Sequence, residues 1–298
     1  MPSIIHYTNC PVCGSTDIYF VFSTKDNTVS KQEFEIWECK ECTLRFTQDI
    51  PDLSFIGSYY KSEEYISHSN TSKGLINRLY KSVRNRSLVQ KRKLIQKTTG
   101  MDKGKLLDLG SGIGSFVNEM TNHGWDVTGI EPDNDARTVA LTSYNITLAD
   151  NDLFKNLPEN SFDVITLWHV LEHVHELHDY VVLLKKRLKE NGKLFIAVPN
   201  YTALDGKIYK QFWAAYDVPR HLYHFTPKSM DDLMKRHGLK ILDYKPMWFD
   251  SFYISLLSSK YKDGRVNWVR AIWRGLRSNI KAIRNIQKCS SVIYVVSR

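Results

Sequence analysis

Residues 106–114 read Leu106-Leu107-Asp108-Leu109-Gly110-Ser111-Gly112-Ile113-Gly114, an apolar run that breaks into a glycine-rich turn. The run is typical of a buried strand, and the glycines let a ligand lie against bare backbone at the start of a helix. Residues 127–130 form a second apolar run, and Glu131 stands at its end, 17 residues after Gly114. A carboxylate at this position can accept hydrogen bonds from both hydroxyls of a ribose. The pattern therefore predicts a strand–turn–helix–strand unit that binds a nucleoside.

The spacing of the glycines indicates which nucleoside is bound. Dinucleotide-binding turns read G-x-G-x-x-G, whereas this turn reads G-x-G-x-G, with Asp108 two residues before Gly110. A carboxylate there repels a pyrophosphate and attracts an ammonium group. The turn therefore favours S-adenosylmethionine (SAM) over NAD. Here the chain resembles the class I SAM-dependent methyltransferases, with good motif agreement over residues 100–200.

That resemblance implies roles for the residues around the turn. Residues 108–114 would line the methionine and ribose parts of SAM, Glu131 would hold the ribose, and Asp150 would approach the adenine amino group. Tyr59 and Tyr60 would fold over the site as a lid, or they would pack the N-terminal segment against the core. The expected SAM-binding set is Asp108, Gly110, Ser111, Gly112, Gly114, Glu131, Pro132, Asp150, Asn151, Trp168, His169, Tyr59 and Tyr60.

Length and composition favour one substantial α/β domain with a small additional module. The chain has 298 residues, of which 42% are hydrophobic, so it can bury a sizeable core. It contains no run of about eighteen apolar residues, the length that would span a membrane. Residues 1–6 lack the basic and apolar regions of a signal peptide. We therefore expect a cytoplasmic protein.

The first fifty residues carry two C-x-x-C pairs, Cys10/Cys13 and Cys39/Cys42, which are separated by 25 residues. Two such pairs complete a tetrahedral site of four thiolates for zinc, which leaves no open position for catalysis. Residues 18–22 and 34–38 resemble short strands between the pairs, as in a zinc ribbon. Two disulfides are the alternative, which a cytosolic location disfavours. The sequence thus predicts a structural Zn²⁺ ion in residues 1–50.

Strand and helix patterns alternate through the rest of the chain. They predict an α/β fold with a doubly wound, seven-stranded, Rossmann-like sheet of the methyltransferase type. We expect a lid and a basic helical linker over residues 51–100, and the SAM-binding domain over 101–298 with a helical insertion at 250–288 before the last strand. The expected strands are 105–109, 125–130, 145–149, 162–168, 192–198, 239–245 and 291–297, the last one antiparallel.

His169-Val170-Leu171-Glu172-His173 matches the H-x-x-E-H pattern of some zinc peptidases. That chemistry needs both histidines on one helical face. His169 follows directly on a predicted strand, so we do not expect a peptidase site. Methyltransferases of bases and glutamine typically carry Asn/Asp-Pro-Pro-Tyr/Phe at this strand end, and pyrimidine C5 enzymes need a cysteine. The chain has neither between residues 43 and 288, which disfavours both classes.

Aromatic, basic and acidic residues concentrate at 212–226, within the predicted substrate loop (200–226). An imidazole there can remove a proton from a hydroxyl or an acidic carbon. Residues 219–225 resemble the Pro-Arg-His-x-x-His-Phe segment of zinc-ribbon methyltransferases of sugar, polysaccharide and natural-product pathways. The resemblance implies His224 as the base, with His221, Tyr223 and His169 as further catalytic candidates. The expected substrate-binding residues are Trp213, Tyr216, Asp217 and Arg220, the last for an anionic group.

Net charge is +9, and basic residues concentrate at 73–105 and 260–298. Such patches attract anionic partners: a small molecule, a glycan, a lipid-linked acceptor, an anionic membrane or RNA. Apolar and basic residues alternate at helical spacing over 266–288, which predicts either a helix on the inner membrane surface or a helix with a solvated basic face. We expect methylation of a hydroxyl or carbon. The alternatives are methylation of rRNA or tRNA, and a non-catalytic SAM-fold binding protein.

Overall fold

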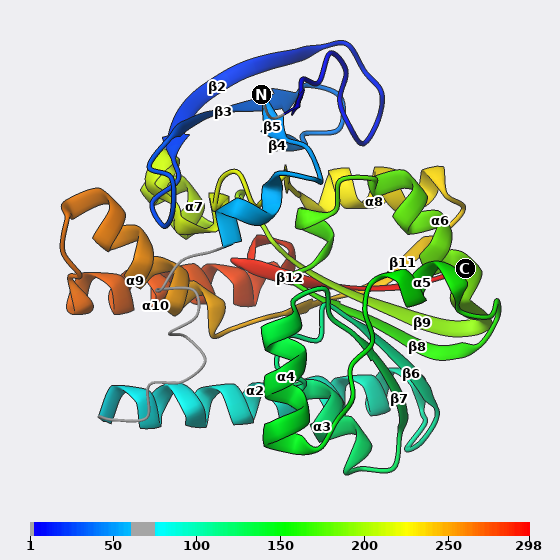
Figure 1. Ribbon diagram of the computed structural model, residues 1–298. Coiled ribbons are helices and arrows are strands. Elements are labelled where there is room, and N and C mark those ends of the chain that lie inside the picture. The colour runs from blue at the N-terminus through cyan, green and yellow to red at the C-terminus, as the bar shows by residue number, and fades with distance from the viewer. Residues whose placement is uncertain (1–2, 61–74) are drawn as a thin grey trace.

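The computed structural model describes residues 3–60 and 75–298. Within these ranges the central sheet has six strands in the order β11-β12-β9-β8-β6-β7 (Figure 1). Strands β7, β6, β8 and β9 run parallel, and β12 is antiparallel to both of its neighbours. The strands are β6 (Lys105–Leu109), β7 (Asp126–Ile130), β8 (Phe162–Trp168), β9 (Leu188–Pro199), β11 (Lys240–Pro246) and β12 (Ser291–Ser297).

The prediction of seven strands was wrong at residues 145–149. Helix α4 (Asn134–Tyr144) ends at Asn145, which adopts a left-handed conformation, and the Ile146 N–H still bonds back to the Ala140 carbonyl. The chain then turns again at Asp150. Too few residues remain for a strand, and only a single parallel bridge between Ala149 and Ile130 forms in this region.

Side chains alternate between the two faces of the central sheet, as the two-residue period of a strand requires. Leu107 and Ile165 pack in one buried cluster with residues of α6 and α8, whereas Leu106 and Val164 pack in another with residues of α2 and α3. Helices thus cover both faces, and the expectation of a doubly wound α/β fold is confirmed (Figure 1). The helices are α2 (Leu75–Thr99), α3 (Ser115–Thr121), α5 (Asp152–Asn156), α6 (Leu177–Arg187) and α8 (Pro227–Arg236).

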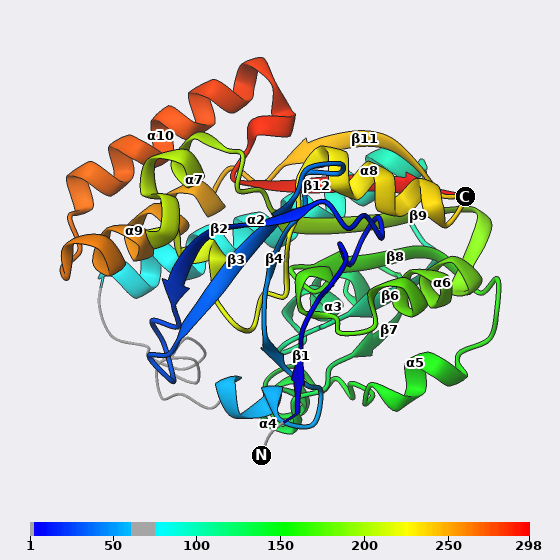
Figure 2. The same cartoon turned by 90° about the horizontal axis from the view of Figure 1, so that it is seen from above.

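The N-terminal module is joined to the substrate loop by a shared sheet. Its strands β2 (Ile18–Lys25), β3 (Glu33–Cys39) and β4 (Arg45–Thr47) form a meander, and β4 pairs antiparallel with β10 (Tyr223–His224). A second, two-stranded sheet pairs β1 (Ile4–Ile5) with β5 (Ile50–Pro51). Figure 1 shows β2 and β3 at the top of the molecule, and in the view from above in Figure 2 the strands β2–β4 cross over it, with helices α7 (Leu204–Tyr209) and α9 (Asp250–Asp263) to one side and the central sheet to the other. The module therefore packs directly against the substrate loop through the pairing of β4 with β10.

Two helices, α9 and α10 (Trp268–Arg284), fill the connection between β11 and β12. They pack against each other and against α7, at the end of the molecule away from β7 (Figure 1). Among the described residues, no helix combines the length and the apolar character needed to cross a membrane.

Candidate active site

The glycine turn between β6 and α3 leaves bare backbone facing open space. Gly110, Gly112 and Gly114 all have positive φ angles, of 66°, 52° and 76°. A side chain at Gly110 or Gly114 would collide with Val170 or Ala140, whereas a Cβ on Gly112 would meet nothing within 4 Å. The turn is therefore held on both sides, and its middle is open to a ligand. This is the cradle that the sequence predicts for SAM.

Glu131 is locked onto this turn. Its Oε2 accepts a 2.7 Å hydrogen bond from the Gly112 N–H, and its Oε1 accepts one of 3.0 Å from the Asp133 N–H. Burial raises the pKa of Glu131, and these hydrogen bonds act against that effect. The carboxylate therefore lies at the open part of the turn, in the register that a ribose requires.

Asp108 lies beneath the turn in the middle of the parallel strands. It is 1% exposed, and its Oδ1 accepts a 2.6 Å hydrogen bond from the Thr166 hydroxyl on the neighbouring strand. Burial raises its pKa to about 6. Lys91 on α2 is a residue that the sequence analysis missed: its Nζ lies 4.3 Å from the centre of the Trp168 ring. Burial lowers the pKa of Lys91 to about 8, against the attraction of Asp108 and Asp250.

Asp150, Pro132 and Asn151 form the rim beyond Glu131. Asp150 pairs with Arg137 at 3.0 Å, and Arg137 also donates to the carbonyl oxygen of Pro132. Asn151 begins the short helix α5 without a capping bond from its side chain. Ser111 donates from its hydroxyl to the Asp108 carbonyl, which stiffens the turn. These residues surround the predicted adenine position, and the structure gives each of them a local partner or a place in the turn.

His169, at the end of β8, lies between two carboxylates. Its Nε2 is 3.0 Å from Asp250 and its Nδ1 is 3.2 Å from Glu172, and its φ of 60° is unusual for a residue other than glycine. Although burial opposes the charge, these two hydrogen bonds raise the pKa of His169 to about 10. The ring is therefore a paired cation at neutral pH, which does not suit it to act as a base. Residues 169–173 span the strand end and a short 3-10 turn, so the peptidase arrangement is absent here.

Glu172, His173 and His221 meet just beyond β8. One ligand atom from each of them lies within 4.8 Å of the others, and the two imidazole rings are edge to face with centres 4.6 Å apart. Nδ1 of His173 lies 2.9 Å from the Arg220 carbonyl oxygen, and Nδ1 of His221 lies 2.9 Å from that of Ala215. In the neutral ring each Nδ1–H then donates, and each Nε2 keeps its lone pair.

Two further observations about this cluster are typical of functional sites. Burial, together with the neighbouring His221, lowers the pKa of His173 to about 4, so its ring is neutral. Glu172 is fully buried, and its Oε2 has no hydrogen-bond partner among the described residues. A buried carboxylate oxygen without a partner is costly and is characteristic of functional sites. The Tyr60 hydroxyl lies 3.0 Å from Nδ1 of His173, so this tyrosine of the predicted lid does reach the cluster.

Arg220, which we expected to bind an anionic group, is buried and paired with two carboxylates. Its guanidinium is 3% exposed and pairs with Asp217 at 2.6 Å and with Asp26 of the N-terminal module at 3.1 Å. It also donates to the backbone carbonyl of Tyr59. Tyr59 itself packs edge to face on Phe34. These contacts join the substrate loop to the module. Breaking them would leave a buried charge without a partner, which is energetically costly.

His224, the base expected from the sequence, lies in β10 against the N-terminal module. It is 2% exposed, its Nε2 lies 3.3 Å from the Thr47 hydroxyl, and its ring packs on Tyr216. Burial holds its pKa well below the usual range. The neighbouring Tyr223 hydroxyl donates to the His175 carbonyl. His221, and not His224, is therefore the loop histidine that reaches the end of β8.

Trp213 and Tyr216 also belong to the packing between module and loop. The Trp213 Nε1–H donates to Asp205 at 2.8 Å, and the Tyr216 hydroxyl accepts from Arg45 at 2.7 Å. Both rings are almost completely buried in one cluster with Phe34 and Ile36 of the module. These two residues, which we expected to bind the substrate, therefore pack the substrate loop against the module.

The four cysteines of the module converge. Their Sγ atoms lie within 4.8 Å of one another, with Cys10–Cys42 and Cys13–Cys39 each at 3.5 Å. A disulfide needs an S–S distance of about 2.05 Å, so these are free thiols. These S–S distances are close to the value of about 3.8 Å that separates two sulfur atoms in a tetrahedral site with Zn–S bonds of about 2.3 Å. The donor set thus suits one tetrahedral metal ion.

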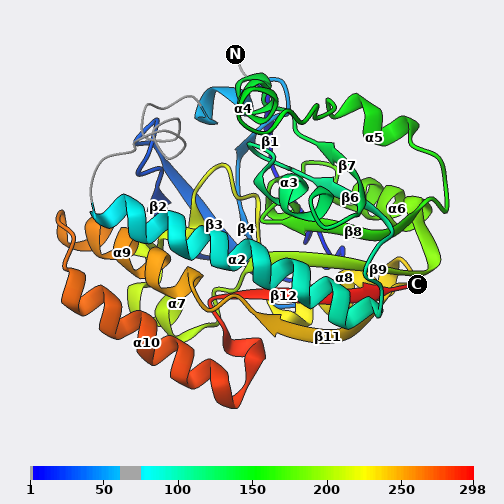
Figure 3. The same cartoon turned by 90° about the horizontal axis from the view of Figure 1, so that it is seen from below.

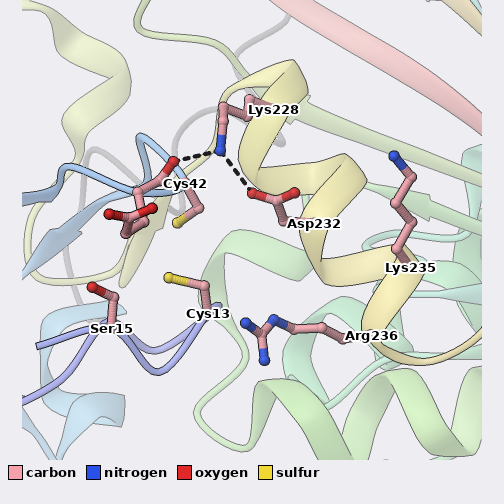
Figure 4. A pocket seen from close by; sticks show the side chains of 8 residues that line it. Cys13, Ser15, Cys42, Lys228, Asp232, Lys235 and Arg236 are labelled. Carbon is pink, nitrogen blue, oxygen red and sulfur yellow. Dashed lines mark hydrogen bonds and ion pairs between the residues drawn. The ribbon is translucent and has the colours of Figure 1, made fainter.

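A hollow of about 410 Å³ lies beside these thiols, between the module and α8 (Figure 4). Two of its three basic side chains are paired: Lys228 binds Asp232 at 3.1 Å and the Glu41 carbonyl, and Lys235 binds Asp231 at 2.6 Å. It is remote from the glycine turn, and its lining carries none of the residues described above except the cysteines. We therefore place the active site at the ends of β6 and β8.

Comparisons with known proteins agree with this geometry. A family model described as "Methyltransferase domain" matches residues 80–244, more than half of the chain. The chain is 37% identical over 120 residues to the ubiquinone biosynthesis O-methyltransferase of Glaesserella parasuis, which covers 36% of this chain and half of that protein. It is 24% identical over 249 residues to the same-named protein of Rickettsia typhi, covering 76% and 96%.

Solved structures with a similar fold include phosphoethanolamine N-methyltransferase 2 of Haemonchus contortus in complex with SAM, with a TM-score of 0.48, 18% identity and coverage of 70% of this chain and 52% of that one. A SAM-dependent methyltransferase of Archaeoglobus fulgidus has a TM-score of 0.47, 18% identity and coverage of 75% and 99%. The match to the family model, which spans β6, the glycine turn and Glu131, establishes that this chain belongs to the methyltransferase-domain family.

Proposed function

We propose that this enzyme transfers the methyl group of SAM to a hydroxyl oxygen of its acceptor, with His221 as the proton acceptor. The observation that carries the proposal is the meeting of His221, His173 and the unpartnered Glu172 oxygen at the end of β8, the strand next to the glycine turn. The name O-methyltransferase of the relatives supports a hydroxyl over a carbon. The acceptor classes that remain are a glycan, a sugar nucleotide, a small molecule and a lipid-linked molecule.

The residues at the turn fit SAM. The open side of Gly112 accommodates the nucleoside. Glu131 accepts hydrogen bonds from the ribose hydroxyls, and Asp108 supplies a negative charge for the ammonium group. When bound, SAM supplies an electrophilic methyl group on a sulfonium. Trp168 lies beside the turn, and an aromatic face of this kind attracts cations such as the Lys91 ammonium that it now contacts.

The chain's own residues then handle the proton. As the acceptor oxygen formed its bond to the methyl carbon and the carbon–sulfur bond broke to leave a neutral thioether, Nε2 of His221 would take the hydroxyl proton. The Nδ1–H of His221 stays on the Ala215 carbonyl, which holds the ring in position. Asp217, whose Oδ2 lies 4.0 Å from Nε2 of His221, and the buried Glu172 both favour the imidazolium that results. Positioning of the two reactants supplies much of the remaining acceleration.

We also propose that Cys10, Cys13, Cys39 and Cys42 hold a structural zinc ion. The Thr43 hydroxyl, directly after the Cys39/Cys42 pair, lies 2.8 Å from the Thr226 hydroxyl, which caps α8. A metal ion that orders the Cys39/Cys42 turn thus also orders the end of the loop that carries His221. Its role is to support the site, because four thiolates complete the coordination of zinc.

Transfer of radiolabelled methyl groups from SAM into fractionated cell extract tests the proposed function. Label that enters a lipid, glycan or small-molecule fraction, is stable to mild base and is released as methyl iodide by hydriodic acid supports ether formation on a hydroxyl, whereas label that resists hydriodic acid would favour methylation of a carbon. Label in the RNA fraction would instead favour the rRNA or tRNA alternative. Binding of SAM with no transfer to any fraction would favour a non-catalytic protein.

A further inference from the structure

We propose that α10 binds the surface of an anionic lipid bilayer. The outward side of this helix carries a row of large apolar side chains that the fold leaves uncovered. Val269 is 81% exposed, Ile283 is 70% exposed and Trp273 is 58% exposed. The remaining exposed members of this apolar stripe are Trp268, Ile272, Leu276 and Ile280. Figure 3 shows α10 at the outer edge of the molecule, beyond α9 and α7.

The helix is attached to the protein through small and polar residues. A Cβ on Gly275 would lie 2.8 Å from the Phe252 ring of α9, so the two helices are in close contact there. Ser278 donates to the buried Asp205, and Asn279 donates to the Trp248 carbonyl. Ala271 and Ala282 are fully buried on the same side. An ordinary surface helix turns its apolar stripe inward, and α10 does the opposite.

Helical geometry divides α10 into three stripes. At about 100° per residue, the buried positions 271, 275, 278, 279 and 282 occupy one third of the circumference. The apolar stripe occupies a second third. The basic residues Arg270, Arg274, Arg277, Lys281 and Arg284 occupy the last, and the helix contains no acidic residue. Of these, Arg277, Lys281 and Arg284 are exposed and unpaired among the described residues, whereas Arg270 pairs with Asp263 of α9 at 3.6 Å and Arg274 packs on the Tyr209 ring. The line that separates the apolar and basic stripes points directly away from the buried side, so both stripes can meet one flat surface.

The combination of the two stripes identifies the partner. An amphipathic helix with Lys or Arg beside Trp, Ile and Leu lies in the interface of a membrane, where anionic headgroups attract the cations and the apolar groups enter the acyl boundary. A second copy of this chain would bring the same basic row against itself, which is repulsive. Nucleic acid would pair with the basic row and leave the apolar stripe in water. An anionic bilayer alone satisfies both stripes.

The length of α10 indicates how it lies on the bilayer. Its 17 residues span about 25 Å along the axis, less than a transmembrane helix needs. Contact with α7 and α9 along the opposite side also prevents it from leaving the protein surface. The helix therefore rests flat on the bilayer and holds the enzyme at the surface. Such a placement would bring a lipid-linked acceptor near the site, but the membrane contact itself does not depend on the proposed reaction.

Co-sedimentation of the full-length protein with vesicles tests this inference. We expect binding to vesicles of phosphatidylglycerol and phosphatidylcholine, weak binding to phosphatidylcholine alone, and a loss of binding as salt is raised. Changing Arg277, Lys281 and Arg284 together to Gln should reduce the bound fraction at least tenfold. The triple change Lys40→Gln, Lys186→Gln and Lys235→Gln removes the same net charge from other exposed positions and should have little effect.

The apolar stripe has its own matched control. Val269→Ser with Ile283→Ser should weaken vesicle binding at the low salt concentration at which the wild type binds, whereas Leu53→Ser, at a site that is 70% exposed, should not. Unchanged SAM binding by each variant shows that it is folded. Equal vesicle binding by the α10 variants and the wild type would overturn the inference. So would a dimer in sedimentation velocity that dissociates on the Val269 and Ile283 changes without any vesicle binding.

Discussion

The Gly112 N–H donates a 2.7 Å hydrogen bond to Oε2 of Glu131, which joins the glycine turn after β6 to the end of β7. The bond holds the carboxylate that we propose for ribose binding against the one glycine of the turn that faces open space. Turn and carboxylate are therefore positioned as one unit before a ligand arrives. Preorganisation of this kind reduces the entropic cost of binding.

Replacing Glu131 by Ala should therefore weaken SAM binding by tenfold or more. The change removes both the acceptor of the ribose hydroxyls and the partner of the Gly112 N–H, and each such hydrogen bond contributes about 1–3 kcal/mol when a charge is involved. Isothermal titration calorimetry measures the affinity. Asp135→Ala, which removes an exposed carboxylate from the adjacent helix α4, is the matched control and should bind SAM normally. Equal affinities for the two variants would contradict the assignment.

His221→Asn should reduce turnover by about 10²–10⁴-fold while SAM binding stays unchanged, because the substitution removes the proton acceptor and leaves the glycine turn intact. His224→Asn should lower stability through its buried contacts, but the folded fraction should keep most of its activity. Radiolabelled methyl transfer at saturating SAM measures both. A larger loss of activity in folded His224→Asn than in His221→Asn would restore His224 as the base.

Stability should depend on pH through His169. Its pKa of about 10 in the folded protein lies above the ordinary value of 6.5, so the folded state retains a proton that the unfolded state releases. The stabilisation is complete below pH 6.5 and is lost as the pH rises through about 10, at no more than about 1.4 kcal/mol per pH unit.

Urea denaturation of the wild type and of His169→Gln between pH 6 and pH 10 measures this effect. We expect the difference in free energy of unfolding between the two proteins to shrink steadily as the pH rises. Lys91 contributes in the opposite direction above about pH 8 but is present in both proteins, so it cancels in the difference. A difference that does not change with pH would show that His169 is not a paired cation.

The buried ion pair between Arg220 and Asp26 should be a major support of the module. Arg220→Gln leaves Asp26 and Asp217 without their cation and should cost about 3–5 kcal/mol in the free energy of unfolding. Lys235→Gln breaks the exposed pair with Asp231 and should cost no more than about 1 kcal/mol. Chemical denaturation compares the two variants. A small effect of Arg220→Gln would mean that this arginine is available for a ligand after all.

Metal analysis tests the cysteine site. Mass spectrometry of the purified protein should find one zinc ion per chain, and Cys13→Ser should lose it, whereas Cys289→Ala, at a buried thiol outside the cluster, should retain it. Chelation should lower the melting temperature and reduce methyl transfer, because the module shares a sheet with β10 of the substrate loop. Full metal content in Cys13→Ser would exclude the four-thiolate site.

Local sequence patterns were sufficient for the parts of the fold that depend on neighbouring residues. The glycine turn and Glu131 lie one helix apart, so their joint position follows from a single β–α–β unit. The C-x-x-C pairs likewise sit on tight turns at the ends of a short meander, and β6, β7 and β8 follow from apolar runs. The predicted strand at residues 145–149 was wrong. Asn145, which the apolar pattern had assigned to the strand, instead ends helix α4 in a left-handed conformation, and only one bridge forms, between Ala149 and Ile130.

The sequence by itself thus determined the cofactor, the doubly wound fold and the cluster of cysteines, since each depends on short-range spacing and periodicity. Only the tertiary structure decided which loop histidine meets Glu172 and His173, because β10 pairs with β4 and places His224 against the N-terminal module. It also paired His169 with Asp250, 81 residues away, and turned the apolar stripe of α10 outward. Amphipathic spacing shows that a helix has two kinds of face, but the packing of Gly275 against Phe252 decides which face is left to the solvent.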